Sequence, residues 1–273
     1  ITITEEGVYI VSGTLEDGQI IVDASDFDKV QIVLDGVHIN CETNAAIYVR
    51  EADKVFITLA ENSSNTLGGG NEYTQIDDNT VDGVIFSKSD LVCNGTGSLT
   101  IEADYKHGIV SKDDLVITGG TTIVYGPTSD GDSALDYDGS AIVTGGTLAA
   151  IGSAGMVESF DEASTQPVIT YYCTETQSAD TTITLTDSDG SALFTVTPEK
   201  AYASIVLTCP EMKLDATYTL AAGTDNEEIT LTDIITTAGT RSVKTMSDPE
   251  GGKMPNNSDN KGTPPSKPSD TAE

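Results

Sequence analysis

Apolar residues recur along this chain at intervals too long for one strand and too irregular for a helix. The phrase HGIVSKDDLVITGG (107–120) resembles both GVIFSKSDLVCNG (83–95) and SALDYDGSAIVTGG (133–146) in its apolar positions. Each unit holds short β-rich runs separated by Gly and Asp, and none shows the 3.6-residue period of a helix. The pattern predicts an all-β protein built from stacked repeats of about 25 residues.

Three columns of apolar residues share this period. They are Ile20, Ile47, Ile85, Ile109 and Leu135; Val30, Val55, Val92, Val116 and Ile142; and Val37, Leu99, Ile123 and Leu148. All three contain the same longer interval, which places an insertion loop at residues 61–80. Three short strands per repeat are typical of a parallel β-helix, whose turns stack about 4.8 Å apart. One turn has no buried face by itself, so only stacking buries the columns.

The pattern changes after residue 163. Alternating strands and turns such as DSDG (187–190) then indicate a small antiparallel segment that packs on the coil or caps its open end. The last residues are rich in Pro, Gly, Ser and Asn, a composition typical of a disordered linker. The predicted organisation is therefore β-helix turns at 1–163, an antiparallel segment at 164–240 and a tail at 241–273.

The chain is strongly acidic, with 13 Lys and Arg against 44 Asp and Glu and a net charge of −31. The charges of residues 241–273 cancel, so the whole net charge lies on residues 1–240. Such a body is not expected to bind nucleic acid or an anionic membrane, and no apolar run is long enough to span a bilayer. Its self-repulsion favours bound divalent cations.

Other chemistry is sparse. The four cysteines lack the spacing of a zinc site; Cys41 and Cys93 are expected as small buried residues, while Cys173 and Cys209 are either buried thiols or a disulfide. His38 and His107 have no nucleophile partner in the sequence, and no hydrolase, P-loop or metalloprotease motif occurs.

The outward side of the predicted coil carries aromatic residues and cations. If the column containing Ile109 faces inward, alternation places its successors on the outside. These are Tyr48, Phe86, Val110 and Asp136, followed two residues later by Arg50, Lys88, Lys112 and Asp138. Rings beside cations suit a glycan that bears carboxylates, so Tyr48, Arg50, Phe86, Lys88 and Lys112 are candidate ligand-binding residues. The alternative is that these cations only neutralise neighbouring acids.

Acidic residues gather in three stretches. Asp130, Asp132, Asp136 and Asp138 lie in one, Asp77, Asp78 and Asp82 in a second, and Asp113 and Asp114 in a third. Closely spaced carboxylates can supply the oxygen ligands of Ca²⁺, although acidic turns are also common without a metal. The first two groups are the preferred candidates for calcium ligands.

The repeat phrases, including DKVQIVLDGVHIN, AAIYVREADKVFITLAE and HGIVSKDDLVITGG, closely resemble a bacterial family of carbohydrate-binding proteins first catalogued as a domain of unknown function. The resemblance covers roughly residues 1–235. It implies a pectate-lyase-like, right-handed parallel β-helix, bound calcium, and secretion or display on clostridia-like bacteria that degrade plant fibre. Longer members insert further turns where two phrases abut here at about residue 120, so a shorter binding face is expected.

We therefore expect a non-catalytic, monomeric protein that binds cellulose-like and acidic pectin-type polysaccharides of the plant cell wall. A calcium-dependent pectate lyase is the first alternative, because a Lys beside calcium could abstract a proton α to a uronate carboxylate. The second alternative is a structural adhesin or spacer at the cell surface.

Overall fold

The computed structural model describes residues 1–240, which contain strands, turns and loops but no helix. The prediction of an all-β protein is therefore confirmed for these residues, which belong to one compact unit. None of these residues forms a helix that could cross a membrane. The prediction of a linker at 241–273 lies outside the described residues.

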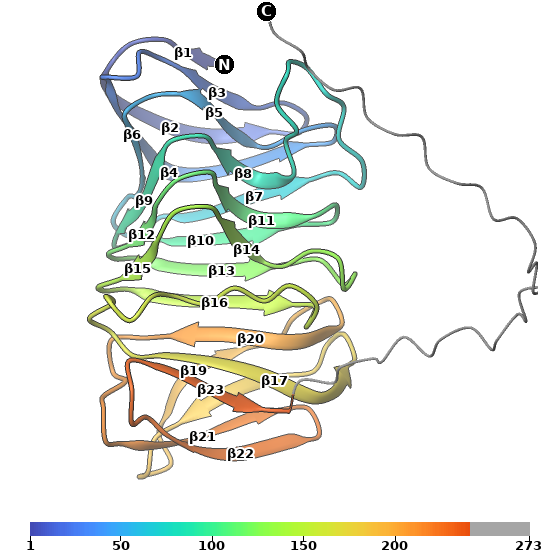
Figure 1. Cartoon of the computed structure of the whole chain (residues 1–273). Helices are drawn as coiled ribbons and strands as arrows, with labels where there is room; N and C mark the ends of the chain where they lie inside the picture. Colours follow the sequence, from blue (N-terminus) through green and yellow to red (C-terminus); the bar gives the residue numbers. More distant parts are fainter. Residues whose placement is uncertain (241–273) are drawn as a thin grey trace, which may run out of the picture. The chain divides into compact units, whose positions relative to one another are not determined.

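Six parallel strands form one sheet in the order β1-β3-β5-β8-β11-β14 (Figure 1). Their bounds are β1 (Thr2–Ile3), β3 (Ile20–Asp23), β5 (Ile47–Glu51), β8 (Gly83–Ser87), β11 (His107–Ser111) and β14 (Leu135–Tyr137). Ile20 pairs with Ile47, and the ladder continues through Ile85 and Ile109 to Leu135. All five side chains are at most 2% exposed, which confirms the first predicted column.

A larger sheet continues the same turns of chain. Its strands are β2 (Gly7–Leu15), β4 (Lys29–Cys41), β6 (Lys54–Leu59), β7 (Ser64–Gly69), β9 (Asp90–Gly95), β10 (Ser98–Glu102), β12 (Leu115–Ile117), β13 (Thr121–Tyr125), β15 (Ala141–Val143), β16 (Thr147–Gly152), β17 (Val168–Gln177), β20 (Tyr202–Thr208) and β23 (Ile235–Gly239). The first part of β4 pairs with β6 and its last part with β7. The sheet therefore has two arms that meet at β4, and both arms share the main core with the six-stranded sheet.

The second predicted column is displaced by one residue in the later turns. Val30 pairs with Val55, but Val55 pairs with Leu91, and Leu91 with Leu115. Leu91 and Leu115 are fully buried, whereas Val116 is only half-buried. Adjacent apolar residues such as Leu115 and Val116 give no sign in the sequence of which one faces inward. The third column is displaced at Ile123 in the same way, because Leu99 pairs with Thr122.

Glycine and asparagine shape the corner between the two arms. Gly120 and Gly146 have φ values of +78° and +84°, a left-handed conformation that favours glycine because it lacks Cβ. In an earlier turn, the buried Asn65 side chain accepts hydrogen bonds from the backbone N–H groups of Gly36 and Val37 at 3.0 Å. The Asn65 side chain therefore satisfies these two backbone donors where the strand-to-strand hydrogen bonds are interrupted at the corner.

The chain after the last parallel turn reverses its direction. Strand β20 runs antiparallel to both β16 and β17, and a separate antiparallel sheet contains β18 (Ile183–Thr186), β19 (Ala192–Val196), β21 (Thr217–Ala222) and β22 (Asp225–Thr230). Val206 of β20 belongs to the main core, whereas its neighbours Ile205 and Leu207 belong to a second apolar cluster with the four-stranded sheet. The change near residue 163 thus separates two sheet architectures within one compact unit.

All four cysteines are free and buried. The alternative of a disulfide between Cys173 and Cys209 is therefore not realised. Burial raises the pKa of Cys173 to about 12 and that of Cys209 to about 11. These thiols are poor nucleophiles at neutral pH because the thiolate form is disfavoured.

Candidate functional site

The predicted outward column lies where the sequence pattern places it, but it is not exposed. Tyr48 pairs with Phe86, Phe86 with Val110, and Val110 with Asp136. Tyr48 and Phe86 are 0% and 3% exposed, and they form an apolar cluster with Val81 and Tyr73 of the connection between β7 and β8. The expectation that Tyr48 and Phe86 stack on sugars is therefore wrong for this conformation, since the insertion loop covers both rings.

Asp77 fastens the insertion loop to the sheet. The Tyr48 hydroxyl donates to Asp77 Oδ2 at 2.8 Å, the Asn79 backbone N–H donates to Oδ1 at 2.9 Å, and the Asn79 amide donates to the Tyr48 hydroxyl at 2.7 Å. Arg50 Nε lies 2.8 Å from Asp77 Oδ2 and its guanidinium lies over the Tyr48 ring. Arg50 also pairs with Asp23 at 3.6 Å, so its charge is already balanced within the protein.

The pKa values of this network follow from burial and hydrogen bonding. Burial, followed by the hydrogen bond to Asp77, raises the pKa of Tyr48 to about 12. Partial burial would raise the pKa of Asp77, but the N–H of Asn79, the Tyr48 hydroxyl and the Arg50 charge together lower it. Asp77 is thus a charged structural group, and its oxygens are occupied by protein donors rather than free for calcium. Asp78, its exposed neighbour, has none of these contacts.

The column of Arg50, Lys88 and Lys112 is called the cation column below. Its two lysines differ in whether they are free to contact a ligand. Lys88 is exposed and forms no ion pair with residues 1–240. Lys112 Nζ lies 2.8 Å from Asp136 Oδ2 and 3.6 Å from Asp138 Oδ1. Partial burial would lower the pKa of Lys112, but its hydrogen bond to Asp136 and the charges of Asp136 and Asp138 raise it. An ammonium group therefore lies where the sequence suggested calcium between Asp136 and Asp138.

Acidic groups and a histidine surround this ion pair. His107 is 6% exposed, and its Nε2 lies 3.7 Å from Asp132 Oδ1. Burial raises the pKa of Asp82, against the opposing charges of His107 and Lys112. Asp82 Oδ1 is buried without a hydrogen-bond partner among residues 1–240. Asp82 thus lies beside this mixed-charge cluster. The predicted calcium group at 77–82 would need Asp82 next to Asp77, and the structure does not place it there.

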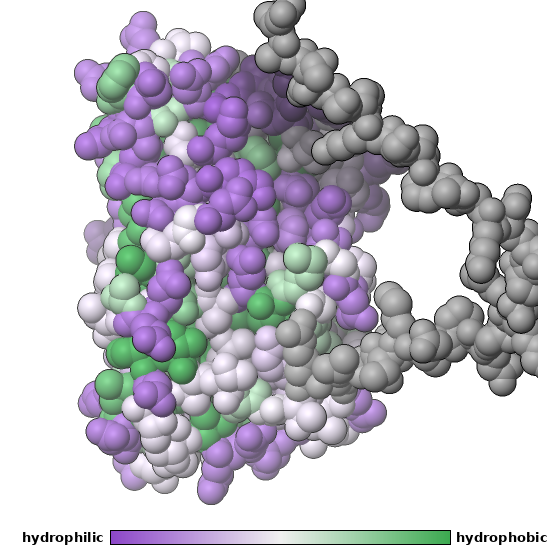
Figure 2. All heavy atoms as spheres, viewed as in Figure 1, coloured by the Kyte–Doolittle hydropathy of each residue, from purple (hydrophilic) through white to green (hydrophobic). Residues whose placement is uncertain are grey.

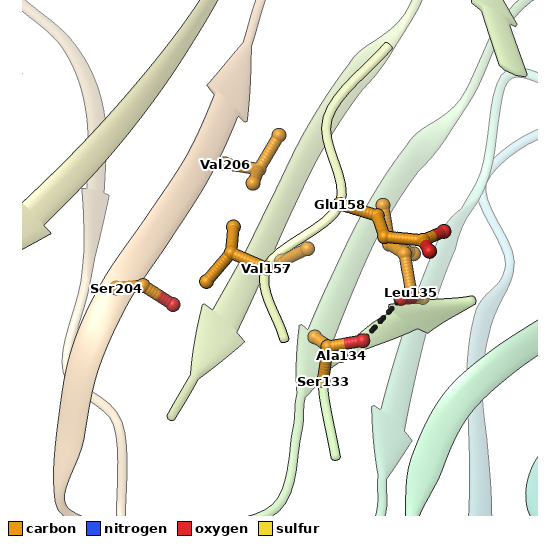
Figure 3. Close-up of a pocket in the computed structure, with 8 residues that line it drawn as sticks. Ser133, Ala134, Leu135, Val157, Glu158, Ser204 and Val206 are labelled. Atoms are coloured by element: carbon orange, nitrogen blue, oxygen red, sulfur yellow. Dashed lines mark hydrogen bonds between the residues drawn. The ribbon is translucent and has the colours of Figure 1, made fainter. Parts of the chain in front are cut away.

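Glu158 joins the same cluster and had no signal in the sequence. It lies after β16, outside the repeated phrases, and its Oε2 accepts a hydrogen bond from the Tyr137 backbone N–H at 3.0 Å. Burial, with Asp136 nearby, raises its pKa. Glu158 also lines a cavity of about 10 Å³ with Ser133, Leu135 and Val206 (Figure 3). This volume is enough for one water molecule at most and excludes a sugar.

A different acidic group brings three carboxylates together. Asp90, Asp113 and Asp114 have ligand oxygens within 4.8 Å of one another, and no other group of three possible ligands this close occurs among residues 1–240. Asp114 Oδ1 accepts hydrogen bonds from Ser140 N and Oγ at 2.7 and 2.8 Å; chiefly through these, its pKa is lowered. Lys54 pairs with Asp90 at 2.9 Å.

This three-aspartate group could have been found from the repeat period. Asp90 and Asp114 each precede the inward leucine of their turn, and these leucines pair in register. Of these three residues, only the adjacent pair Asp113 and Asp114 stands out as an acidic stretch in the sequence. Carboxylate oxygens at this separation fit a hard cation such as Ca²⁺, which takes six to eight oxygen ligands. The predicted set of Asp130, Asp132, Asp136 and Asp138 is not gathered in this way.

The surface outside these groups is polar toward the N-terminal strands. Figure 2 shows hydrophilic side chains over most of that region, with hydrophobic side chains more frequent over the C-terminal strands in this view. The exposed cation Lys88 therefore lies in a predominantly acidic, hydrophilic protein with a net charge of −31.

A comparison with protein families decides the membership of the chain. Residues 1–171 match the model described as "Carbohydrate-binding domain-containing protein". The chain belongs to this carbohydrate-binding domain family. A member from Acetivibrio thermocellus (strain ATCC 27405) with the same description is 40% identical over 126 residues, which is 45% of this chain and 44% of the relative. The chain thus matches less than half of that relative's length.

A solved structure is also similar to part of the chain. It is described as a gadolinium derivative of the polysaccharide lyase-like protein from C. thermocellum. The similarity has 34% sequence identity and a TM-score of 0.45, and it covers 54% of this chain and 63% of the other.

Proposed function

We propose that this member of the carbohydrate-binding domain family is a non-catalytic polysaccharide-binding protein with a right-handed, pectate-lyase-like β-helix. The family membership makes a carbohydrate ligand the starting point. The observation that carries the proposal is how the two lysines of the cation column are paired. Lys88 is free to meet a ligand carboxylate, and Lys112 is held charged between Asp136 and Asp138. A lysine held charged, as Lys112 is, can bind a uronate carboxylate but cannot accept a proton.

The proposed ligands are acidic pectin-type and cellulose-like polysaccharides of the plant cell wall, bound by a monomer outside the bacterial cell. Calcium is part of the proposal, with Asp90, Asp113 and Asp114 as its best-fitting ligands. The ion would reduce the repulsion between carboxylates. The acidic glycan is expected at Lys88, because Arg50 is balanced by Asp23 and Asp77.

Replacing Lys88 with Ala tests the acidic-glycan site. We expect about a 2- to 5-fold loss of affinity for oligogalacturonate, the effect of one exposed ion pair, measured by calorimetry. Lys29→Ala removes another exposed charge, on β4, where Lys29 pairs with Asp53 at 3.5 Å, and should leave the affinity unchanged.

The same samples test the non-catalytic assignment. Polygalacturonate incubated with the protein and calcium should show no sustained rise in ultraviolet absorbance, which reports the unsaturated product of a lyase. Sustained turnover would replace the binding function with the lyase alternative, and equal losses in both lysine variants would exclude Lys88 as the contact.

A further inference from the structure

A groove of about 290 Å³ lies where the parallel turns meet the C-terminal segment. It is lined by Glu102, Tyr125, Thr197, Glu199 and Lys200. Glu102 and Tyr125 are direct neighbours across β10 and β13, whereas the other three residues follow β19. The C-terminal segment therefore supplies one wall of the groove and the outward side of the large sheet supplies the other.

Packing and hydrogen bonding fix the two walls. Tyr125 is half-buried and packs against the second apolar cluster, so its ring is held in place. Lys200 Nζ donates to the Ala103 carbonyl at 2.8 Å and pairs with Asp104. These contacts link the loop after β19 to the end of β10. The groove is thus formed before any ligand binds, which lowers the entropic cost of binding.

The polar groups of the groove are available to a ligand. The Tyr125 hydroxyl has no hydrogen-bond partner within residues 1–240, and neither Glu102 nor Glu199 forms an ion pair with a described cation. Burial, followed by the charges of Glu102 and Glu199, raises the pKa of Tyr125, as expected for a phenol close to both carboxylates.

We propose that this groove binds a neutral sugar unit of a glycan, at a site separate from Lys88. A partly exposed aromatic ring offers an apolar surface to the C–H face of a pyranose. Two carboxylates accept hydrogen bonds from sugar hydroxyls, and such charge-assisted bonds are stronger than neutral ones. This inference rests on the proposed function only in taking the ligand to be a glycan.

The charges of the groove select against acidic sugars. A uronate would place its carboxylate near Glu102 and Glu199, and like charges at short range are repelled. The ammonium of Lys200 does not compensate, because Asp104 and the Ala103 carbonyl already hold it. The volume lies near the lower end of ligand sites, so the groove accommodates a short stretch of chain.

Calorimetry with cellohexaose and a galacturonate hexamer tests this site in the full chain. Tyr125→Ala removes the ring, and Glu199→Ala removes an exposed carboxylate without disturbing the core. Each is expected to lower the affinity for cellohexaose about 10-fold or more, because an anchoring side chain is lost. Neither should weaken binding of the galacturonate hexamer.

Glu61→Ala is the matched control, since Glu61 is also exposed but lies at another corner of the fold. If Glu199→Ala binds cellohexaose as tightly as the wild-type protein does, the proposed sugar site in the groove is excluded. Binding of the galacturonate hexamer without any binding of cellohexaose would also exclude the proposed sugar site in the groove, but it would leave the proposed binding of acidic glycan at Lys88 intact. Binding of neither hexamer by the wild-type protein would remove both.

Discussion

Asp77 illustrates how one carboxylate determines which side chains a protein face exposes. Its hydrogen bonds with Tyr48 and Asn79 hold the insertion loop over the aromatic rings. The sequence placed Tyr48 and Phe86 on the outward side of the turn correctly. It could not show that a mostly polar loop, with Tyr73 and Val81 as its apolar contacts, folds back to cover them. Inward and outward are set by alternation, but exposure depends on distant residues.

Replacing Asp77 with Asn is expected to lower the free energy of unfolding at pH 7 by about 2 kcal/mol, the typical value of hydrogen bonds to a charged group. The folded pKa of Asp77 lies below its ordinary value. Its contribution is therefore complete above the ordinary pKa of about 4 and is lost as the pH falls through the folded value. Urea unfolding at pH 7 and pH 3 measures both effects.

Asp78→Asn removes the same charge from the neighbouring exposed position and should change stability by less than about 0.5 kcal/mol. Equal effects of the two substitutions, or a deficit in Asp77→Asn that is as large at pH 3 as at pH 7, would contradict the stabilising role of the charged Asp77.

The strand register shows which features of an element can be predicted from sequence. The first column was predicted correctly because the charged Asp136 after Leu135 marks the outward side of that turn, and Ile47, Ile85 and Ile109 hold the same place in the repeat as Leu135. The second was displaced because Leu115 and Val116 are adjacent and both apolar. The period fixes the spacing between turns, while the face of each strand also needs knowledge of its neighbours.

Alanine substitutions in β12 test this register. Leu115→Ala should lower the free energy of unfolding by about 3 kcal/mol, because it leaves a cavity in the core. Val116→Ala, one residue further along the same strand, should cost about 1 kcal/mol or less, since its side chain is half-buried. Chemical denaturation of both variants gives the comparison, and a larger loss for Val116→Ala would restore the register expected from the sequence.

Most of the net charge of −31 lies on the stack of short turns. Like carboxylates in successive turns are close neighbours, so repulsion accumulates along the stack. Lys54 and Lys112 relieve it at two places. The composition predicts a need for cations, and this stays a prediction. The gathering of Asp90 with Asp113 and Asp114 could not be read from composition, because it depends on the register and on the turn after β11.

Calcium is expected to raise the melting temperature. At a hundredfold excess over its dissociation constant, one bound ion stabilises the folded state by about 2.7 kcal/mol, or roughly 5 to 10 °C. Calorimetric melting with calcium and then with chelator measures the shift. Asp113→Asn should reduce this shift, because it removes one of the three carboxylates. Asp113 is exposed, and its replacement spares the hydrogen bonds between Asp114 and Ser140.

Asp78→Asn serves again as the control and should retain the full shift. A shift of the same size in both variants would exclude the three-aspartate group as the calcium site, and no shift in the wild-type protein would exclude calcium as a stabilising ion.

The in-register ladder from Ile20 to Leu135 has an evolutionary consequence. Because each turn repeats the contacts of the one before it, a duplicated turn could be added to the stack without redesigning its neighbours. Each duplication would lengthen the protein by about 4.8 Å while the two ends kept their own side chains. The distance between Lys88 and the C-terminal segment could thus increase in fixed increments, one for each added turn.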